Sequence, residues 1–503
     1  MGLHDYTMYH VLKRNARIFG HRTALVFERE RVTYGELIDK VDSLSAGLAS
    51  HGVEAGDRVA VLAQNCLEYV YLYAAAAKLG AILLPINWRL STDEIQHVLS
   101  DGSPKLFFVD SDYQAAVTPL LDGGSFSLEC FGMDEAAGPF KPFSDLTTGG
   151  SRISYVEPND LDGWIIMHTA AVQGKARGAL LTHRGPLLVA DQLVKCFSLT
   201  HEDANIVMLP LFHVMGLLMT LTAMIPGGVN VILPRFDADK VLDTIEEEHI
   251  TMFGEFAPIL KSILDKASES VRGLSSVRHV VGLDLPETIE RFQNETNGTF
   301  WTVYGQSETS GFVTAGPYSE KPGAAGRPLP FAEVEIVDDM GNVVAPGVSG
   351  EIVARGPVVF RGYWNLEQET EYTFRGGWHH TGDMGRLDND GYLWFEGRAP
   401  EKELIKPGGE NVYPAEVEKA ILEHEAVKET VVIGVPDVKW GEAVKAVCVL
   451  EQGASLSAKD LIDFVAGRIA RYKKPQHVVF VSELPKTGSG AIDRQKVKED
   501  HGS

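Results

Sequence analysis

The strongest local signal in the chain is WHHTGDMGRLDNDGYLWFEGR, residues 378–398, which follows a Gly-Gly turn. It contains Asp383 in a Thr-Gly-Asp loop, fifteen residues before Arg398. An aspartate in such a loop can accept hydrogen bonds from the two neighbouring hydroxyls of a ribose, and an arginine can bind the same sugar or a phosphate with two hydrogen bonds. Taken alone, a turn aspartate and a surface arginine would explain the pattern as well.

Three further motifs surround this stretch. Residues 304–308 (YGQSE) combine an aromatic ring that can stack on a base, a hydroxyl for a phosphate and a carboxylate for Mg²⁺. Residues 168–178 (HTAAVQGKARG) lie between two apolar segments and fit a phosphate cradle, although the spacing is not that of the common P-loop. Residues 405–418 (IKPGGENVYPAEVE) contain paired glycines, which permit close approach of a ligand to the backbone. Each motif alone is weak.

The segments around these motifs predict an α/β fold. Up to about residue 400 the chain alternates short apolar segments with helix-like ones, and this alternation is typical of mostly parallel sheets covered by helices. From about Ala332, short strands separated by Gly, Pro and Asp turns predict an antiparallel, barrel-like piece. A small α+β unit follows. The expected helices are 34–51, 68–79, 415–424 and 458–470, and the expected strands are 58–63, 81–86, 105–110, 164–167, 179–181, 230–234, 333–337, 350–355, 391–395, 427–434 and 443–451.

Length and composition limit the interpretation. A chain of 503 residues is too long for one compact core, so we expect a large N-terminal domain, residues 1–397, and a small C-terminal domain, residues 398–503. The net charge of −23 argues against nucleic acid or an anionic membrane as a general partner, but not against a small ligand that carries phosphate groups. The longest apolar stretch, 211–233, contains His213 and Pro226, and we interpret it as buried core rather than a membrane span.

The four cysteines are scattered and lack the spacing of metal ligands, and the N-terminus lacks the pattern of a signal peptide. Both observations favour a cytoplasmic protein with reduced thiols. We expect it to be a monomer or a homodimer.

The order of the motifs along the chain is much more specific than any one of them. Together with residues 485–494 (PKTGSGAIDR), they resemble the signature set of the adenylate-forming superfamily, from about Tyr34 to Arg494. This superfamily includes acyl-CoA synthetases, the adenylation domains of peptide synthetases and beetle luciferases. The resemblance implies an AMP-forming acyl-CoA synthetase that uses ATP, Mg²⁺ and coenzyme A.

The resemblance also implies a role for individual positions. Tyr304 would stack on adenine, Ser307 would bind the α-phosphate and Glu308 would hold Mg²⁺. Asp383 would accept from the ribose hydroxyls, with Phe395 and Arg398 beside the sugar. The remaining nucleotide-binding candidates are Thr169, Gly174, Lys175, Arg177, Gly282, Leu283, Asp284 and Gly305. The coenzyme A candidates are Lys406, Gly408, Gly409, Glu410, Tyr472 and Lys474. The acyl-pocket candidates are His213, which would lie at its mouth, Phe256, Gly305 and Gly311.

The implied chemistry has two half-reactions. The carboxylate attacks the α-phosphate of ATP and gives acyl-AMP and pyrophosphate, and positioned cations stabilise the charge that develops. The small domain then rotates, and the thiol of coenzyme A attacks the acyl carbon. The hinge is expected after Arg398, within residues 399–403, which form a longer segment than is usual in the superfamily.

The phosphate loop departs from the superfamily pattern T-[SG]-G-[ST]-T-G-x-P-K-G. Residues 170–173 (AAVQ) replace most of its small and hydroxylated positions, and Arg177 replaces a lysine. Fewer hydroxyl donors predict a looser hold on pyrophosphate, offset in part by Lys175 and Arg177. A hypothesis follows that the enzyme runs readily in the ATP-forming direction.

The second departure is Ala491, which stands where the superfamily has a catalytic lysine in the pattern Gly-Lys-[ILV]-x-Arg. That lysine bridges the carboxylate and the α-phosphate. Losing such a contact in a transition state costs on the order of several kcal/mol, so we expect adenylation to fall about 100-fold or more. The thioester half-reaction uses the other face of the small domain and should survive. Because the surrounding motif is intact, we interpret Ala491 as a deliberate replacement.

Other functions stay open at this point. Ala491 and the altered loop also fit a catalytically silent paralogue that binds a nucleotide or acyl-CoA, and a luciferase-like oxygenase shares the scaffold. A peptide-synthetase adenylation domain fits less well, because residues 209–216 contain no acidic residue. The pocket candidates predict a bulky apolar acid, which can be aromatic, alicyclic or a medium-chain fatty acid.

Overall fold

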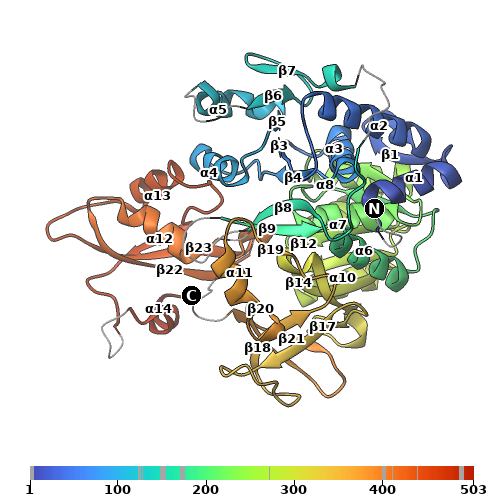
Figure 1. Cartoon of the computed structure of the whole chain (residues 1–503). Helices are drawn as coiled ribbons and strands as arrows, with labels where there is room; N and C mark the ends of the chain where they lie inside the picture. The colour runs from blue at the N-terminus through green and yellow to red at the C-terminus, as the bar shows by residue number, and fades with distance from the viewer. Residues whose placement is uncertain are drawn as a thin grey trace.

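We describe the protein from a computed structural model. The structure describes residues 5–122, 126, 128–147, 155–169, 176–270, 272–398, 404–410, 412–438, 440–486 and 492–502. Within these residues the chain forms four sheets with helices around them (Figure 1). Three sheets belong to the large N-terminal domain, and one belongs to the small C-terminal domain, drawn in orange to red beside it.

The first large sheet is mostly parallel and, apart from the edge strand β19, is built from about the first 180 residues of the chain. Its strands β3, β4 and β5 are short apolar runs that are almost completely buried, as expected for strands covered on both faces. The order is β19-β9-β8-β4-β3-β5-β6-β7. The bounds are β3 Arg58–Leu62, β4 Ile82–Pro85, β5 Leu106–Val109, β6 Glu129–Gly132, β7 Phe140–Pro142, β8 Gly163–Thr169, β9 Arg177–Thr182 and β19 Gly362–Tyr363.

The second large sheet has the order β16-β15-β14-β13-β12-β10-β11-β1-β2. Its central strands are parallel, and antiparallel strands complete both edges. The bounds are β1 Thr23–Phe27, β2 Glu30–Thr33, β10 Ala204–Val207, β11 Val229–Ile232, β12 Met252–Phe256, β13 His279–Leu283, β14 Thr299–Gln306, β15 Gly311–Pro317 and β16 Arg327–Pro328.

Helices fill the space around and between these sheets. α7 (Val214–Met224) is buried along its whole length, because it is apolar on every side and packs within the main core. The prediction that 211–233 is buried core is therefore confirmed. None of the described helices is both long and apolar enough to cross a membrane. The other helices of the large domain are α1 Met8–Phe19, α2 Tyr34–Ser50, α3 Leu67–Leu79, α4 Thr92–Gly102, α5 Ser111–Asp122, α6 Arg184–Phe197, α8 Ala238–Glu248, α9 Ile259–Glu269, α10 Pro286–Glu295 and α11 Glu367–Thr373, with short 3₁₀ turns η1 Phe143–Leu146, η2 Ser307–Thr309, η3 Tyr318–Glu320 and η4 Arg375–Gly377.

Two smaller sheets complete the fold. The predicted antiparallel piece is a four-stranded sheet with the order β17-β18-β20-β21. The small domain contains the three-stranded sheet β22-β23-β24 and packs helices against it. The bounds are β17 Glu333–Val337, β18 Gly350–Arg355, β20 His379–Leu387, β21 Leu393–Arg398, β22 Val427–Asp437, β23 Gly441–Leu450, β24 His477–Phe480, η6 Pro407–Gly409, α12 Pro414–Leu422, α13 Ala458–Ala466 and α14 Arg494–His501.

Most predicted elements are present, and many of their boundaries differ from the prediction by one to four residues. Two of these differences have a clear local cause. The helix predicted over 458–470 ends at Ala466, because Gly467 caps it. The strand predicted from Gly391 begins at Leu393, because Gly391 has a φ of 79° and belongs to the preceding turn. The domain boundary predicted between residues 397 and 398 stays a prediction.

Helices α2 and α4 of the large domain begin with the same capping motif. In α2 the carboxylate of Glu36 accepts from the backbone and hydroxyl of Thr33, and in α4 that of Glu94 does so from Ser91. Each serine or threonine in turn accepts from the backbone N–H of its glutamate. Such capping boxes satisfy N–H groups that a helix leaves open at its start.

Candidate active site

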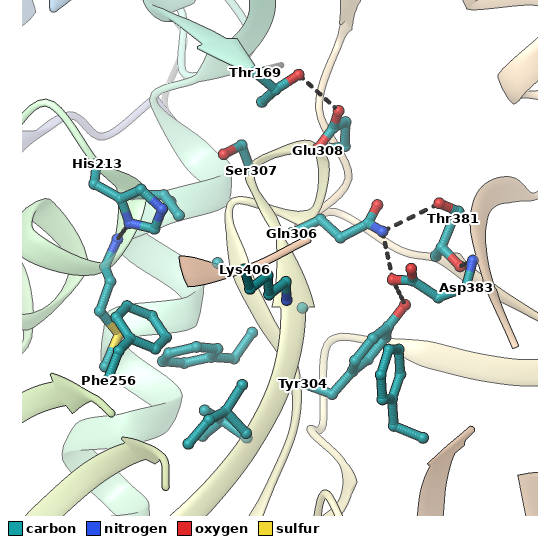
Figure 2. A pocket seen from close by; sticks show the side chains of 18 of the residues that line it. Thr169, His213, Phe256, Tyr304, Gln306, Ser307, Glu308, Thr381, Asp383 and Lys406 are labelled. Carbon is teal, nitrogen blue, oxygen red and sulfur yellow. Dashed lines mark hydrogen bonds between the residues drawn. The ribbon is translucent and has the colours of Figure 1, made fainter. Parts of the chain in front are cut away.

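A cavity of about 340 Å³ lies where the large and small domains meet. It has a polar end around Asp383 and Glu308 and an apolar end around Phe256, and Figure 2 shows the two ends on opposite sides of Lys406. Its lining residues are Thr169, Arg177, His213, Val214, Met215, Phe256, Ala257, Leu283, Val303, Tyr304, Gly305, Gln306, Ser307, Glu308, Gly311, Phe312, Ala325, Tyr363, Thr381, Asp383, Phe395, Arg398, Lys406, Tyr413, Trp440, Gly441 and Glu442. Many predicted site residues therefore lie together.

Asp383 is the centre of the polar end. The register of β20 and β21 makes Asp383 and Arg398 direct Cα partners, which brings together two residues fifteen positions apart. Arg398 Nε lies 2.9 Å from one carboxylate oxygen of Asp383. The other oxygen accepts from Tyr304 Oη at 2.8 Å and Gln306 Nε2 at 2.7 Å. Burial opposes the charge of Arg398, but Asp383 outweighs it and raises the pKa of the guanidinium.

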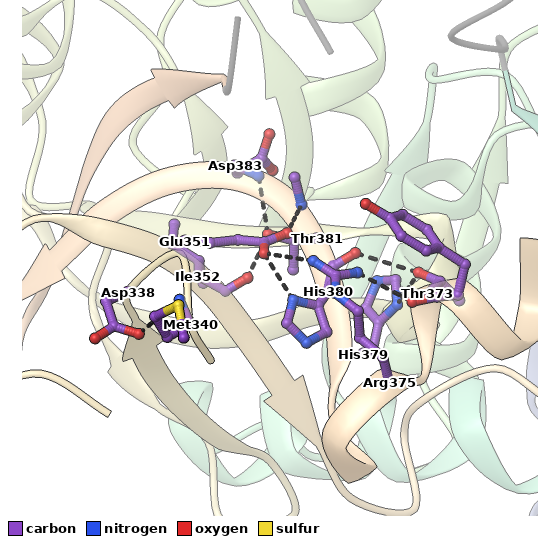
Figure 3. A network of polar contacts seen from close by, with 12 residues as sticks. Asp338, Met340, Glu351, Ile352, Thr373, Arg375, His379, His380, Thr381 and Asp383 are labelled. Atoms are coloured by element: carbon purple, nitrogen blue, oxygen red, sulfur yellow. Dashed lines mark hydrogen bonds and ion pairs between the residues drawn. The ribbon is translucent and has the colours of Figure 1, made fainter. Parts of the chain in front are cut away.

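The loop that carries Asp383 is held from behind by Glu351 of β18 (Figure 3). Glu351 accepts from the backbone of Gly382 at 2.9 Å and pairs with His380 at 2.6 Å. Thr381 donates to the carbonyl of Ile352 at 2.6 Å and accepts from the backbone of Asp383 at 3.0 Å. These contacts fix the direction of the Asp383 side chain without using either of its oxygens.

Glu308 also lies at the polar end and is 7 % exposed. Its carboxylate accepts from Tyr363 Oη at 3.0 Å and Thr169 Oγ1 at 3.3 Å. Arg177 stacks on the ring of Tyr363, with its guanidinium carbon 4.2 Å from the ring centroid. A carboxylate beside a phosphate site suits Mg²⁺, which proteins hold with one or two carboxylates and substrate phosphates. Gly174 and Lys175 of the predicted phosphate loop lie outside the described residues.

The apolar end is formed by side chains without charge. His213 accepts a hydrogen bond from the backbone of Met215 at Nδ1, 3.2 Å away, so the neutral ring carries its proton on Nε2. Burial lowers the pKa of His213 to about 4. Its ring meets that of Phe256 edge to face, with centroids 6.0 Å apart. A Cβ on Gly305 would lie 1.8 Å from the carbonyl oxygen of Gly311, so this wall has no room for a side chain at position 305.

The predicted adenine-binding wall contains a feature that the sequence did not indicate. Leu283 lines the cavity, whereas Gly282 lies in front of Glu255: a Cβ at Gly282 would be 2.6 Å from Glu255 Oε1. Glu255 is completely buried and neither of its carboxyl oxygens has a hydrogen-bond partner among the described residues. Burial raises the pKa of Glu255, with the neighbouring Asp284 acting in the same direction, and burial raises the pKa of Asp284 to about 6.

The small domain contributes one side of the cavity. Tyr413 accepts a hydrogen bond from Arg398 at 3.2 Å, and Gly408, with a φ of 59°, donates from its backbone to Trp440 at 2.9 Å. Lys406 was predicted in the coenzyme A group, and the structure places it in the cavity with Asp383 and Arg398. Its side chain extends into the cavity, where protein surrounds it on the other sides. This enclosure, together with the positive charge of Arg398, lowers the pKa of Lys406.

Three of the other coenzyme A candidates line two narrow clefts between the domains, each of about 90 Å³, that also reach His213. One contains Gly408 and Glu410, and the other contains Glu410 and Tyr472. Gly409 ends η6, and Lys474 is partly buried beside Lys473.

Ala491 lies outside the described residues. Its described neighbours Lys486 and Ile492 form a bridge with each other, and Lys486 pairs with Glu429 at 2.8 Å. Ile492 packs on an apolar cluster of the small domain that includes Val431. None of these four residues lines the cavity.

Comparison with known proteins identifies the family of the chain. Residues 12–364 match the family described as AMP-binding enzyme, and residues 416–491 match its C-terminal domain. An indoleacetate–CoA ligase from Aromatoleum aromaticum is 34% identical over 500 residues, which cover 97% of both chains.

Two solved structures of o-succinylbenzoate CoA synthetase from Bacillus subtilis are each 30% identical to this chain. A double mutant bound to a product analogue superposes with a TM-score of 0.87 and covers 98% of this chain and 99% of that one. The complex with an acyl-adenylate intermediate gives 0.72 with 99% of each chain covered. The chain therefore belongs to the adenylate-forming superfamily of AMP-binding enzymes and is an AMP-forming carboxylate–CoA ligase.

Proposed function

We propose that this ligase activates a bulky apolar monocarboxylic acid with ATP and Mg²⁺ and transfers the acyl group to coenzyme A. The observation that carries the proposal is the cavity with a polar end at Asp383 and Glu308 and an apolar end at Phe256. An acyl-adenylate has the same division, with a charged nucleotide joined to an apolar acyl group.

The apolar end favours acids without a second charge. Met215, Phe256 and Phe312 line it, and His213 is neutral there at physiological pH because its pKa is about 4. A second carboxylate would lose its hydration among these apolar side chains, which is unfavourable. Aromatic, alicyclic and medium-chain acids all fit this chemistry, and a relative at 34% identity is a ligase of an aromatic acid, indoleacetate.

At the polar end, we assign the ribose to Asp383 and Arg398, the base to Tyr304 and Leu283, and the α-phosphate to Ser307. Glu308 would hold Mg²⁺, which supplies charge neutralisation for the phosphates when it is bound. Thr169 and Tyr363 hold the carboxylate of Glu308 in place, and Arg177 adds a positive charge beside it.

The orientation of the small domain supports the thioester half-reaction. Lys406, Trp440 and the backbone around Gly408 face the cavity, whereas the bridge between Lys486 and Ile492 does not line it. The two B. subtilis complexes cover nearly the same share of this chain, so their different TM-scores reflect the arrangement of their parts, and the product-analogue complex agrees better.

We further propose that Ala491 replaces the lysine that serves adenylation and impairs that half-reaction alone. The decisive test supplies chemically made acyl-adenylates with benzoyl, cyclohexanecarbonyl and octanoyl groups together with coenzyme A. Thioester should form with at least one of them. A protein that binds these adenylates but makes no thioester would instead be the catalytically silent paralogue that Ala491 and the altered phosphate loop also suggest.

The reverse direction can be tested with Ala491→Lys. The variant is supplied with acyl-CoA, AMP and pyrophosphate, and ATP is measured. If the altered phosphate loop loosens the hold on pyrophosphate, ATP should form readily. An Ala491→Lys enzyme that releases pyrophosphate in the forward direction but makes no ATP would contradict this part of the proposal.

A further inference from the structure

Lys473 is a buried cation at the boundary between the two domains. It is 5 % exposed, although lysine is almost never buried unless it is paired. It lies next to Tyr472 in a segment assigned above to coenzyme A, but its ammonium group is taken up by protein partners. Those partners come from both domains.

Two carboxylates hold the ammonium group. Glu94 of α4, in the large domain, forms a short ion pair with Lys473 Nζ. Glu416 of α12, in the small domain, lies 2.7 Å from the same nitrogen. Glu94 also accepts from the backbone N–H of Ala470 at 3.2 Å, which is a second contact across the boundary. Glu416 therefore orients the Lys473 side chain within the small domain, and Glu94 of the large domain pairs with the ammonium group so oriented.

The charges of this cluster favour the contact. Burial would raise the pKa of Glu94, but Lys473 and the hydrogen bonds from Ser91 outweigh it and lower the pKa. Burial would likewise lower the pKa of Lys473, but Glu416 and Glu94 outweigh it and raise the pKa. Glu94 and Lys473 are thus both charged near neutral pH. Separating them without a replacement partner would leave the carboxylate of Glu94 without its cation, whereas Lys473 would keep Glu416.

The contact joins one residue of the large domain to two of the small domain. Glu94 belongs to the large domain, whereas Lys473 and Ala470 belong to the small domain, so a rotation of one domain against the other would separate them. The orientation in which they meet places Lys406, Trp440 and Gly408 at the cavity and its clefts. A second ion pair, Arg89 to Glu410, crosses the boundary nearby.

We propose that Lys473 is a positioning residue, and that its ion pair with Glu94 latches the small domain in the orientation used for thioester formation. Lys473 acts through the domain position and not by contact with the reacting atoms. This inference rests on the ligase function proposed above and adds a specific determinant of its second half-reaction.

The test separates the two half-reactions in the full-length chain. Glu94→Gln removes the charge but keeps the capping box of α4, because glutamine also serves at that position. Thioester formation is measured in a single turnover with coenzyme A and whichever of the three acyl-adenylates reacts fastest with the parent chain. Adenylation is measured as acid-dependent pyrophosphate release without coenzyme A, in an Ala491→Lys background.

We expect Glu94→Gln to slow thioester formation about tenfold and to leave adenylation unchanged or faster, because only the latched population falls. Glu36→Gln is the matched control: Glu36 occupies the same capping position in α2, is exposed, and should change neither rate. Lys473→Met should also slow thioester formation, and combining it with Glu94→Gln should add little, because both remove one contact.

Three outcomes overturn the inference. Thioester formation by Glu94→Gln at the parent rate shows that the ion pair does not set the orientation. Equal losses in both half-reactions, or additive effects of Glu94→Gln and Lys473→Met, show a general structural role. Absence of thioester with the parent chain is a different result, because it rejects the proposed ligase function itself.

Discussion

Asp383 and Arg398 face each other across β20 and β21, and the aspartate is shared between Arg398, Tyr304 and Gln306. A buried carboxylate with three fixed partners is held in place before any ligand arrives. The pairing of β20 with β21 and these three contacts therefore fix the position of the Asp383 side chain.

Replacing Asp383 by Asn should weaken AMP binding roughly 10- to 100-fold, because charge-assisted hydrogen bonds contribute about 1.5–3 kcal/mol. Calorimetric titration with AMP measures it. Asp390→Asn is the control, since Asp390 lies in the same hairpin but is exposed and pairs with Lys321. Equal AMP affinity for the parent chain and Asp383→Asn would remove Asp383 from the nucleotide site.

Tyr363→Phe should raise the Mg²⁺ concentration needed for half-maximal pyrophosphate release in the Ala491→Lys background. The reason is that Glu308 loses the hydrogen bond from Tyr363 Oη, while the ring under Arg177 remains. We expect a shift of about fivefold, since a hydrogen bond to a charged group contributes roughly 1.5 kcal/mol or less when one partner of several is lost. Tyr372→Phe, at an exposed position, should show no shift. An unchanged Mg²⁺ dependence for Tyr363→Phe would contradict the role of Glu308 as ligand.

Phe256→Ala should change which acids are used. Removing the ring that faces His213 enlarges the apolar end, so kcat/KM should rise for bicyclic acids relative to benzoate. The variant should also lose affinity for small acids, since their contact surface decreases. The measurement is thioester formation from matched acyl-adenylates of increasing size. Phe331→Ala, at an exposed site outside the cavity, controls for general effects of losing an aromatic ring. The same relative rates for all acyl groups would place the acyl pocket elsewhere.

The partly buried Asp284, which lies beside the buried Glu255, predicts that the stability of the protein depends on pH. The pKa of Asp284 is about 6 in the folded chain against 3.8 for the free residue, so between about pH 4 and pH 6 the folded state binds more protons than the unfolded state. The free energy of unfolding should therefore decrease as pH rises through this window. Asp284→Asn removes this contribution, so it should stabilise the protein more at pH 7 than at pH 4.5. Denaturant unfolding at both values measures the difference, and an equal effect at the two pH values would contradict it.

The sequence predicted the positions that lie in local motifs better than those that depend on distant contacts. Asp383, Arg398, Tyr304 and Glu308 lie in short patterns whose chemistry is visible in the residues themselves, and all four line one cavity. Residues joined by long-range pairing were missed. Tyr363 reaches Glu308 only because the two-residue strand β19 pairs with β9.

Glu255 and Lys473 show why the rest could not be predicted. Glu255 lies in an apolar strand and becomes notable only because Gly282 of the neighbouring strand β13, and Asp284 just after the end of that strand, lie beside it. Lys473 stands between two assigned residues, Tyr472 and Lys474, and its partner Glu94 is 379 positions away. No periodicity or spacing in one sequence contains such a contact.

The cavity wall formed by Lys406, Tyr413 and Trp440 has a consequence for the lifetime of the intermediate. Because these residues belong to the small domain, closure of that domain over the cavity would hold an acyl-adenylate there, and movement of the domain would let it leave. Water is kept from the mixed anhydride by the same closure. In a cell, each adenylate lost to solvent would hydrolyse and consume an ATP without yielding thioester. Because the small domain forms this wall of the cavity, retention of the intermediate depends on how often the small domain opens. Solvent viscosity, which slows domain motion, should therefore affect the yield of thioester per ATP as well as the rate of thioester formation.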